Sequence, residues 1–245
     1  MNGTATVRLG MVKPTNDSES REDLEALLPD DIEMDYEYMG FAYKSLDEFR
    51  TAMPAYEEKV AALAARGADL IHPEGAPPFM LQGYAAESRY IADWQARFGV
   101  PVFTTGSTQV AAMRALGINR FVGYTPFSGE LAEAFRKYFT DAGFEVLAMG
   151  KPVAEDEEVY DLTTAEIGDR IVRSFAGEPD GAEALYILGS DWRVLDVLES
   201  LEAALEIPVL HPVVVRCWYI LTQLGRRQPI EGHGRLLATM PPFAA

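Results

Sequence analysis

Side chains that could exchange protons follow two apolar segments of the chain. His72 and Glu74 lie in the stretch LIHPEGAPPF, where a predicted strand ends in a proline-rich turn. Ser190 and Asp191 follow a second apolar segment, ALYILG. A histidine titrates near neutral pH, and a carboxylate fixed in a loop can act as a general base. Loop carboxylates, helix caps and structural histidines use the same residues, so these four are candidates for catalysis rather than an assignment.

A further set of side chains could hold a negatively charged substrate. Ser107 and Thr108 open a predicted helix after TTG, and backbone N–H groups at a helix start attract anions. Arg216 could bind a carboxylate directly, while Tyr124 and His211 each end a predicted strand. Helix capping is compatible with anion binding at Ser107 and Thr108, packing alone would explain Tyr124, and a buried structural role is the more common one for a histidine such as His211.

Neither a metal nor an organic cofactor is expected. The candidate histidines and carboxylates lack the close spacing of metal ligands, and no glycine-rich phosphate motif follows a strand. The single cysteine, Cys217, cannot form a disulfide within the chain. It lies in the apolar segment VVVRCWYILTQL, beside Trp218, which indicates a buried structural thiol rather than a nucleophile.

The overall composition limits the classes of partner. The chain has 245 residues, 48% of them hydrophobic, and a net charge of -17. So acidic a surface repels phosphates, which argues against nucleic acid and anionic membranes as partners. The first residues lack the apolar core of a signal peptide, and the most apolar run is interrupted by His211, Pro212 and Arg216. We therefore expect a cytoplasmic protein without a membrane span, and leave open whether it forms a homo-oligomer.

Predicted strands and helices alternate from end to end, which favours parallel sheets with helices on both faces. Apolar segments closed by turn residues predict strands over residues 5–14, 32–39, 68–75, 101–106, 120–126, 144–152, 184–190 and 208–212. The helix over 45–67 should have Ser45 as its N-cap and should kink or break at Pro54. The next helix is expected only over 80–99, behind three prolines.

The chain also repeats itself. Residues 68–117 and 183–225 share one order of features: a strand, a turn, a helix, a second strand that starts with Pro-Val, and a helix that ends with Leu-Gly. This repeat predicts two similar α/β halves related by a pseudo-two-fold axis. The first half would comprise 1–115 together with 211–245, and the second 116–210.

The repeat predicts where a ligand would bind. In open parallel sheets, ligands bind beyond the carboxyl ends of the strands. The loops 73–78 and 189–193 should therefore line a cleft between the halves. Glu74 would face Ser190 and Asp191 across it.

Two segments, GVPVFTTGSTQVAAMRALGINRFVGYTPF and ALYILGSDWRVLDVLESLEAALEIPVLHP, resemble the aspartate/glutamate racemase superfamily, most of all its branch of arylmalonate decarboxylases and maleate cis-trans isomerases. The resemblance covers nearly the whole chain. It implies two Rossmann-like or flavodoxin-like halves and catalysis without a cofactor. The racemases and isomerases of this superfamily have one catalytic cysteine on each wall of the cleft. The decarboxylases have a glycine at the first of these two positions and a cysteine at the second.

Matched by position, the two catalytic positions of the family fall on Gly75 and Ser190, so this sequence has neither cysteine. The Thr-Ser pair with which the decarboxylases bind a carboxylate is replaced by Ala-Pro, directly after Gly75. Ser107 and Thr108 do match a Ser-Thr pair at a helix start. Because a serine hydroxyl is far too weak an acid or base to replace a thiol unaided, the neighbouring carboxylates become the expected acid and base.

The residues and the resemblance together predict a cofactor-independent isomerase or decarboxylase that acts on a small carboxylate or dicarboxylate. The expected catalytic residues are Glu74, Asp191, Ser190 and His72. The expected substrate-binding residues are Gly75, Ser107, Thr108, Tyr124, His211 and Arg216. Two alternatives stay open: a hydrolase or lyase in which the carboxylates activate water, and a carboxylate-binding protein without catalysis.

Overall fold

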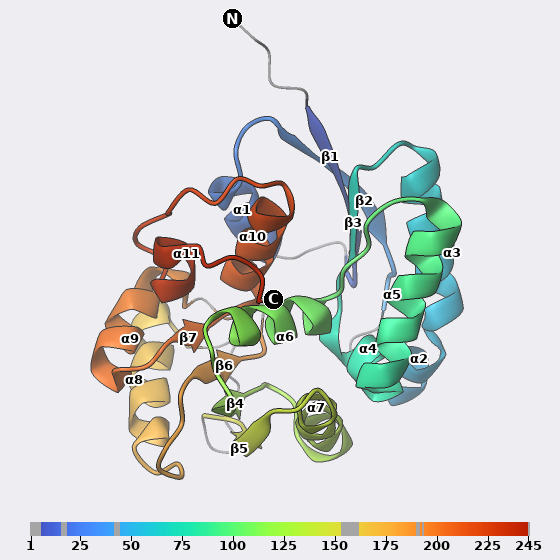
Figure 1. The fold of residues 1–245 in the computed structure, drawn as a ribbon. Coiled ribbons are helices and arrows are strands. Elements are labelled where there is room, and N and C mark those ends of the chain that lie inside the picture. The colour runs from blue at the N-terminus through green and yellow to red at the C-terminus, as the bar shows by residue number, and fades with distance from the viewer. Residues whose placement is uncertain are drawn as a thin grey trace, which may run out of the picture. The chain divides into compact units, whose positions relative to one another are not determined.

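The computed structural model describes residues 6–15, 19–41, 45–152, 162–189, 192 and 194–244, without the side chains of 19 and 20. The chain forms two compact units, Met1–Thr108 and Gln109–Ala245, each built around its own parallel sheet (Figure 1). The predicted fold class, two α/β halves with parallel sheets, is confirmed. The assignment of 211–245 to the first half stays a prediction.

The sheet of the first unit consists of β1 (Val7–Lys13), β2 (Ile32–Tyr38) and β3 (Leu70–Pro73), in the order β2-β1-β3. The central strand β1 is parallel to both neighbours, and its register with β3 places Met11 opposite His72. β2 lies at the edge of this sheet, as its alternation of apolar and polar residues predicts. The register brings the carboxyl ends of β1 and β3 side by side.

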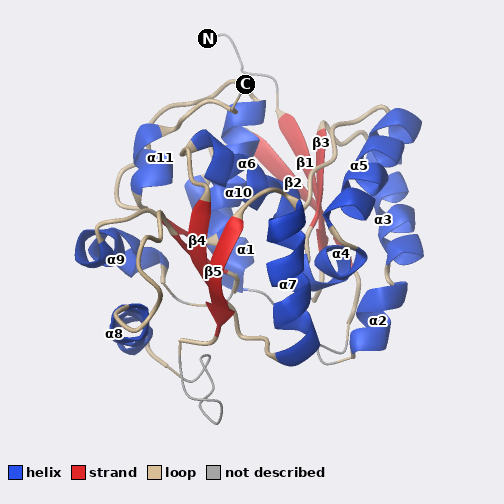
Figure 2. Cartoon of the chain, turned by 60° about the horizontal axis from the view of Figure 1, so that its bottom comes forward, coloured by secondary structure: helices blue, strands red, loops and turns tan. Residues whose placement is uncertain are grey.

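The described helices of the first unit are α1 (Glu19–Leu27), α2 (Leu46–Thr51), α3 (Met53–Ala65), α4 (Ala76–Gln82) and α5 (Tyr84–Phe98). Helices α2 to α5 lie on one face of the sheet and α1 on the other, as both views show (Figure 1 and Figure 2). The reason is topological. The chain moves in one direction from β1 to β2 and in the opposite direction from β2 to β3, so right-handed crossovers place the helices on opposite faces.

The helix predicted over 45–67 is divided in two, as expected. α2 ends before Pro54, which occupies the first turn of α3. Ser45 caps α2, since its hydroxyl accepts a hydrogen bond from Glu48 N at 3.3 Å. Proline removes a backbone donor and clashes with the preceding turn, so it ends one helix and can begin the next.

The prediction of a single helix over 80–99 is wrong. α4 already begins at Ala76 and carries Pro77 and Pro78 in its first turn. Prolines fit there because the first N–H groups of a helix have no acceptor within it. Gly83, with a φ of 87°, then separates α4 from α5.

The strand predicted over 101–106 is reduced to a single bridge. Val102 pairs in parallel with Ile71 of β3. The chain then enters α6 (Thr105–Ala115), which continues past the boundary between the two units. The early start of α6 reflects a polar cap at its first turn, which belongs to the candidate site.

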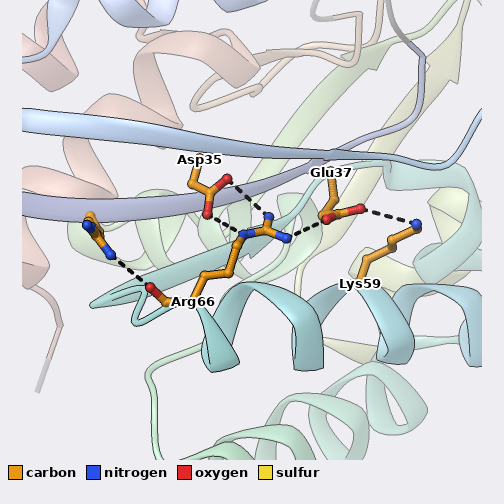
Figure 3. A network of polar contacts seen from close by, with 5 residues as sticks. Asp35, Glu37, Lys59 and Arg66 are labelled. Atoms are coloured by element: carbon orange, nitrogen blue, oxygen red, sulfur yellow. Dashed lines mark hydrogen bonds and ion pairs between the residues drawn. The ribbon is translucent and has the colours of Figure 1, made fainter.

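A network of charged side chains fastens α3 to the edge strand β2 (Figure 3). Arg66, just after α3, binds Asp35 through two nitrogens, at 2.7 and 3.1 Å, and Glu37 through a third, at 2.7 Å. Lys59 lies 3.1 Å from Glu37, and Arg8 donates to the carbonyl oxygen of Arg66 at 2.8 Å. The network anchors α3, which carries a residue of the candidate site, to the sheet.

The sheet of the second unit has the order β5-β4-β6-β7, with all pairs parallel. Its strands are β4 (Arg120–Tyr124), β5 (Glu145–Gly150), β6 (Leu185–Ile187) and β7 (Val209–Leu210). The described helices are α7 (Gly129–Asp141), α8 (Thr164–Phe175), η2 (Leu195–Val197, a 3₁₀ turn), α9 (Leu198–Leu205), α10 (Pro212–Gln223) and α11 (Arg235–Thr239). Helix α7 lies on one face of this sheet, and α8 and α9 lie on the other (Figure 2).

Each unit has an apolar core between its sheet and its helices. In the first unit the core joins strand residues to aromatic side chains of the helices, among them Val12, Ile71, Tyr56, Phe79 and Trp94. In the second unit aromatic rings meet edge to face, among them Phe121, Phe139, Phe144 and Tyr186. No helix in the described part of the chain is long and apolar enough to cross a membrane.

Candidate functional site

The carboxyl edge of the first sheet holds a buried ion pair. Lys13 is the last residue of β1, and Glu74 follows β3 directly. The Nζ atom of Lys13 lies 2.7 Å from Oε2 of Glu74, and the two side chains are only 2% and 6% exposed. Glu74 is a predicted site residue, whereas Lys13 was missed. The available signal was a lysine that directly continues an apolar strand, in GMVKP.

The backbone on either side of Glu74 is fixed by hydrogen bonds. Its N–H donates to Val12 O at 2.9 Å, and its carbonyl oxygen accepts from the hydroxyl of Tyr56 at 2.6 Å. Gly75 has a φ of 129°, and a Cβ atom there would lie 2.5 Å from the Tyr56 hydroxyl oxygen. The turn therefore needs glycine, and Tyr56 of α3 is a second contributor that the sequence did not reveal.

His72 is a buried structural residue. Its Nδ1 atom lies 2.8 Å from Phe103 O, and its ring stacks on that of Phe103 with centroids 4.9 Å apart. A carbonyl oxygen can only accept, so Nδ1 carries the proton in this contact. His72 thereby joins β3 to the segment that leads into α6. Its predicted role in catalysis stays a prediction.

The start of α6 is held by reciprocal hydrogen bonds. Ser107 N donates to Thr104 Oγ1 at 3.1 Å, and Thr104 N donates to Ser107 Oγ at 2.9 Å. The Thr104 hydroxyl in turn donates to the buried carboxylate of Glu87 at 2.7 Å. The hydroxyl of Thr108 donates to Thr105 O at 2.9 Å. Ser107 and Thr108 therefore serve as capping residues, and their predicted contact with a substrate stays a prediction.

This helix start lies beside the turn that carries Glu74. Gly75 N donates to Thr105 Oγ1 at 3.4 Å. Within the first unit, the structure thus brings together Lys13, Glu74, Gly75 and the first turn of α6. This arrangement combines a buried carboxylate, a buried cation and a helix N-terminus. A helix N-terminus can bind an anion, and a carboxylate can accept or donate a proton.

Three predicted residues of the second unit are buried. The Tyr124 hydroxyl donates to Glu178 Oε1 at 3.2 Å, and burial raises the pKa of Tyr124. Arg216 of α10 is 1% exposed. His211 follows β7 and is wholly buried. Substrate binding by these three residues stays a prediction.

His211 is fixed in its neutral form. Its Nδ1 atom accepts from Val213 N at 3.4 Å, so Nε2 carries the proton and donates to Gly189 O at 3.0 Å. Burial, with a contribution from the charge of Arg216, lowers the pKa of His211 to about 4. It therefore holds the beginning of the loop after β6 and does not exchange protons near neutral pH.

Ser190, Asp191 and Arg193 lie outside the described residues, so the expected contact of Glu74 with Ser190 and Asp191 stays a prediction. Cys217 is buried in α10, as predicted, and burial raises its pKa to about 12. In the described part of the chain no cluster of three or more histidine, cysteine or carboxylate side chains could hold a metal ion.

The two parallel sheets, with buried polar residues at their carboxyl edges, define an α/β protein of the two-unit type. The model of the arylmalonate decarboxylase family matches residues 9–237. The chain therefore belongs to the arylmalonate decarboxylase family. A comparison with curated protein sequences found no match.

Solved structures share the fold at low sequence identity. The maleate isomerase Iso from Pseudomonas putida S16 is 18% identical, with a TM-score of 0.83 over 96% of this chain and 99% of that one. An arylmalonate decarboxylase is 20% identical, with a TM-score of 0.79 over 94% and 98%. The maleate cis-trans isomerase of Nocardia farcinica is 22% identical, with a TM-score of 0.79 over 95% and 98%.

Proposed function

We propose that the protein is a cofactor-independent enzyme that transfers a proton to or from a carbon atom of a small carboxylate, as an isomerase or a decarboxylase. Glu74 would be the acid or base. The place of Glu74 carries the proposal: its buried carboxylate follows β3 and immediately precedes Gly75. The resemblance matches Gly75 to a catalytic position of the family, and buried titratable groups cluster at functional sites.

Two reactions fit this arrangement. In an isomerisation that inverts a carbon centre, ionised Glu74 removes a proton from the carbon next to the substrate carboxylate, and the electron pair is delocalised into that carboxylate. A proton supplied by water then adds to the other face of the carbon, and Glu74 later releases the proton that it took up. In a decarboxylation, the bond to a leaving carboxylate breaks and carbon dioxide departs. The electron pair left on carbon then takes a proton from protonated Glu74. Either reaction needs a positioned acid or base and a group that binds the remaining carboxylate.

The first turn of α6 is the proposed carboxylate anchor. The N–H groups of Ser107 and Thr108 are bonded to Thr104, through its hydroxyl and its carbonyl oxygen. The N–H groups of Thr105 and Gly106 would therefore receive the substrate carboxylate, aided by the helix dipole. In this proposal Ser107 and Thr108 act by shaping the helix start.

The test is turnover of small carboxylates by the purified protein and by Glu74→Gln. Phenylmalonate is a suitable probe of decarboxylation because one relative is an arylmalonate decarboxylase. Phenylsuccinate, which has a hydrogen on the saturated carbon next to a carboxylate, is a suitable probe of proton removal from carbon. Loss of a positioned acid or base should lower kcat by about 10²-fold or more. Proton NMR of the reaction mixture in D₂O would follow both the exchange of the hydrogen next to the carboxylate and the loss of carbon dioxide.

Two controls separate chemistry from folding. Glu74→Gln removes one charge of a buried ion pair, a change that destabilises proteins by about 3–5 kcal/mol. The double variant Lys13→Met/Glu74→Gln removes both charges and should fold better while it stays inactive. Glu202→Gln alters a glutamate that accepts from Val209 N and Arg235 N in the second unit, and should retain turnover. A fully active Glu74→Gln would defeat the proposal.

A further inference from the structure

We propose that Lys13 is a positioning residue that keeps Glu74 ionised in the resting protein, so that the reaction begins with removal of a proton from carbon. This inference rests on the proposed function and chooses between its reactions. A protein whose acid/base group starts ionised is prepared for isomerisation or racemisation rather than decarboxylation. The substrate class would then be carboxylic acids with a hydrogen on the carbon next to the carboxylate.

The side chains of Lys13 and Glu74 are in direct contact. Lys13 Nζ and Glu74 Oε2 are 2.7 Å apart, within the range of a charge-assisted hydrogen bond. Strand register fixes this contact, because Met11 lies opposite His72 and Glu74 N donates to Val12 O. Both side chains are almost fully buried, so the contact is shielded from water.

Burial affects the charge state of a carboxylate. A buried carboxylate without a counter-charge is strongly disfavoured and takes up a proton instead. An ammonium group in contact with it reverses this preference. Protonation of Glu74 would also weaken its contact with this ammonium, so the resting state in which both groups are charged is the favoured one.

The other groups around the pair do not replace Lys13. Tyr56 of α3 donates to the main-chain oxygen of Glu74, and His72 of β3 contacts Phe103 O through Nδ1. Glu25 of α1 interacts with the charge of Lys13, and Glu87 of α5 accepts from Thr104 near the start of α6. Tyr56 carries no charge and Glu25 is negative, whereas Lys13 is the positively charged group in direct contact with the Glu74 carboxylate.

The direction of proton transfer follows from this charge state. An ionised carboxylate can accept a proton from carbon at once. To protonate a carbanion after loss of carbon dioxide, Glu74 would first have to take up a proton beside the ammonium of Lys13. The pair therefore favours the reaction that begins with Glu74 as base.

The first experiment needs no substrate. Protein labelled with ¹³C at the glutamate carboxyl groups is titrated by NMR, and the Glu74 signal is assigned by its loss in Glu74→Gln. We expect the signal of an ionised carboxylate at pH 7. In Lys13→Met its protonation midpoint should rise by about one pH unit or more, while Lys13→Arg should stay close to the wild type. A protonated Glu74 in the wild-type protein at pH 7 overturns the inference, even if Lys13→Met fails to fold.

The second experiment separates the two reactions with matched probes. Phenylsuccinate has a hydrogen next to a carboxylate and should exchange it for deuterium in D₂O. Methylphenylmalonate has no such hydrogen and can only lose carbon dioxide. We expect exchange with the first probe and no reaction with the second, with the acid limb of the pH–rate profile shifted to higher pH in Lys13→Met. A purely structural role of Lys13 would lower the rate without moving that limb.

The outcomes distinguish the two claims. Glu74-dependent decarboxylation of methylphenylmalonate, without exchange of phenylsuccinate, would overturn the inference about Lys13 and leave the proposed function standing. Exchange that survives Glu74→Gln would contradict the proposed function itself. An unchanged acid limb in a folded Lys13→Met would show that the ammonium does not set the protonation state of Glu74.

Discussion

At the residue scale, burial decides which titratable groups can exchange protons near neutral pH. His211 stays neutral because burial lowers its pKa to about 4, and Cys217 stays protonated because burial raises its pKa to about 12. Glu74 is buried as well, but it has a lysine as its direct partner. This partner is what makes Glu74, rather than His211 or Cys217, the candidate acid/base group.

The protonation of His211 should make stability depend on pH. The folded protein binds a proton at His211 only near pH 4, whereas an unfolded chain binds it near pH 6.5. As the pH falls from about 6.5 toward 4, the unfolded state is favoured, and the free energy of unfolding should drop by about 1.4 kcal/mol per pH unit from this group. Urea denaturation of the wild type and of His211→Asn at several pH values measures it.

His211→Asn is a suitable comparison because asparagine retains the capacity to cap α10 but has no titrating side chain. Above about pH 7 the difference in unfolding free energy between the two proteins should be constant. Below that pH it should shrink. A constant difference down to pH 5 would mean that His211 is protonated equally in both states.

The sequence predicted some residues of the candidate site and missed others. Glu74 could be chosen because it follows an apolar strand and precedes a proline-rich turn. Lys13 directly continues an apolar strand, which marks it as unusual, but the sequence could not pair it with Glu74 because that contact depends on the register of two strands that are far apart in the chain. Glu87 was missed for the same reason, since it meets Thr104 only when α5 packs beside the start of α6.

At the scale of the elements, the turn between β3 and α4 positions the candidate base. Gly75 holds a φ of 129°, Tyr56 of α3 bonds to the carbonyl oxygen of Glu74, and Gly75 N reaches Thr105 of α6. A strand, a helix and a helix start thus meet at one turn. A substitution in this turn should therefore shift the position of Glu74 without removing its carboxylate group.

Gly75→Ala should destabilise the protein and lower its activity. The new Cβ atom would lie 2.5 Å from the Tyr56 hydroxyl oxygen, in a backbone conformation that non-glycine residues avoid. Gly83→Ala is the matched control, because Gly83 also has a positive φ but no atom within 4 Å of an added Cβ. We expect Gly75→Ala to lose about 1–3 kcal/mol more of unfolding free energy than Gly83→Ala.

A double variant tests the cause. Gly75→Ala/Tyr56→Phe removes the hydroxyl that the new methyl group would meet, so the two changes together should cost less than the sum of their separate effects. Thermal and urea denaturation measure these effects. Additive losses would show that the Tyr56 hydroxyl is not the obstacle.

The elements themselves were predictable where local chemistry determines them. Pro54 divides a helix and Ser45 caps one because both act on their own turn of backbone. The starts of α4 and α6 were placed too late. Pro77 and Pro78 were taken as obstacles to a helix although they fit its first turn, and the strand over 101–106 shortens to one bridge because the mutual capping of Thr104 and Ser107 begins α6 early.

At the scale of the whole molecule, repetition in the sequence predicted the architecture. Each unit has a parallel sheet, and in each the candidate residues lie at the carboxyl ends of strands: Lys13 and Glu74 in the first, Tyr124 and His211 in the second. Ligands bind at these ends in open α/β sheets. With a net charge of -17, binding of an acid requires a local positive potential, and in our proposal the N-terminus of α6 would supply it in the first unit.

A crystal structure of the protein with phenylsuccinate bound would test the central claim most directly, because it shows where the acid lies relative to Glu74. We predict one ligand carboxylate at the N–H groups of Thr105 and Gly106. The carbon that bears the acidic hydrogen should lie about 3–3.5 Å from a carboxylate oxygen of Glu74, the separation at which a reacting group can attack. A ligand bound elsewhere, with Glu74 separated from it by other side chains, would contradict the assignment of Glu74 as the base.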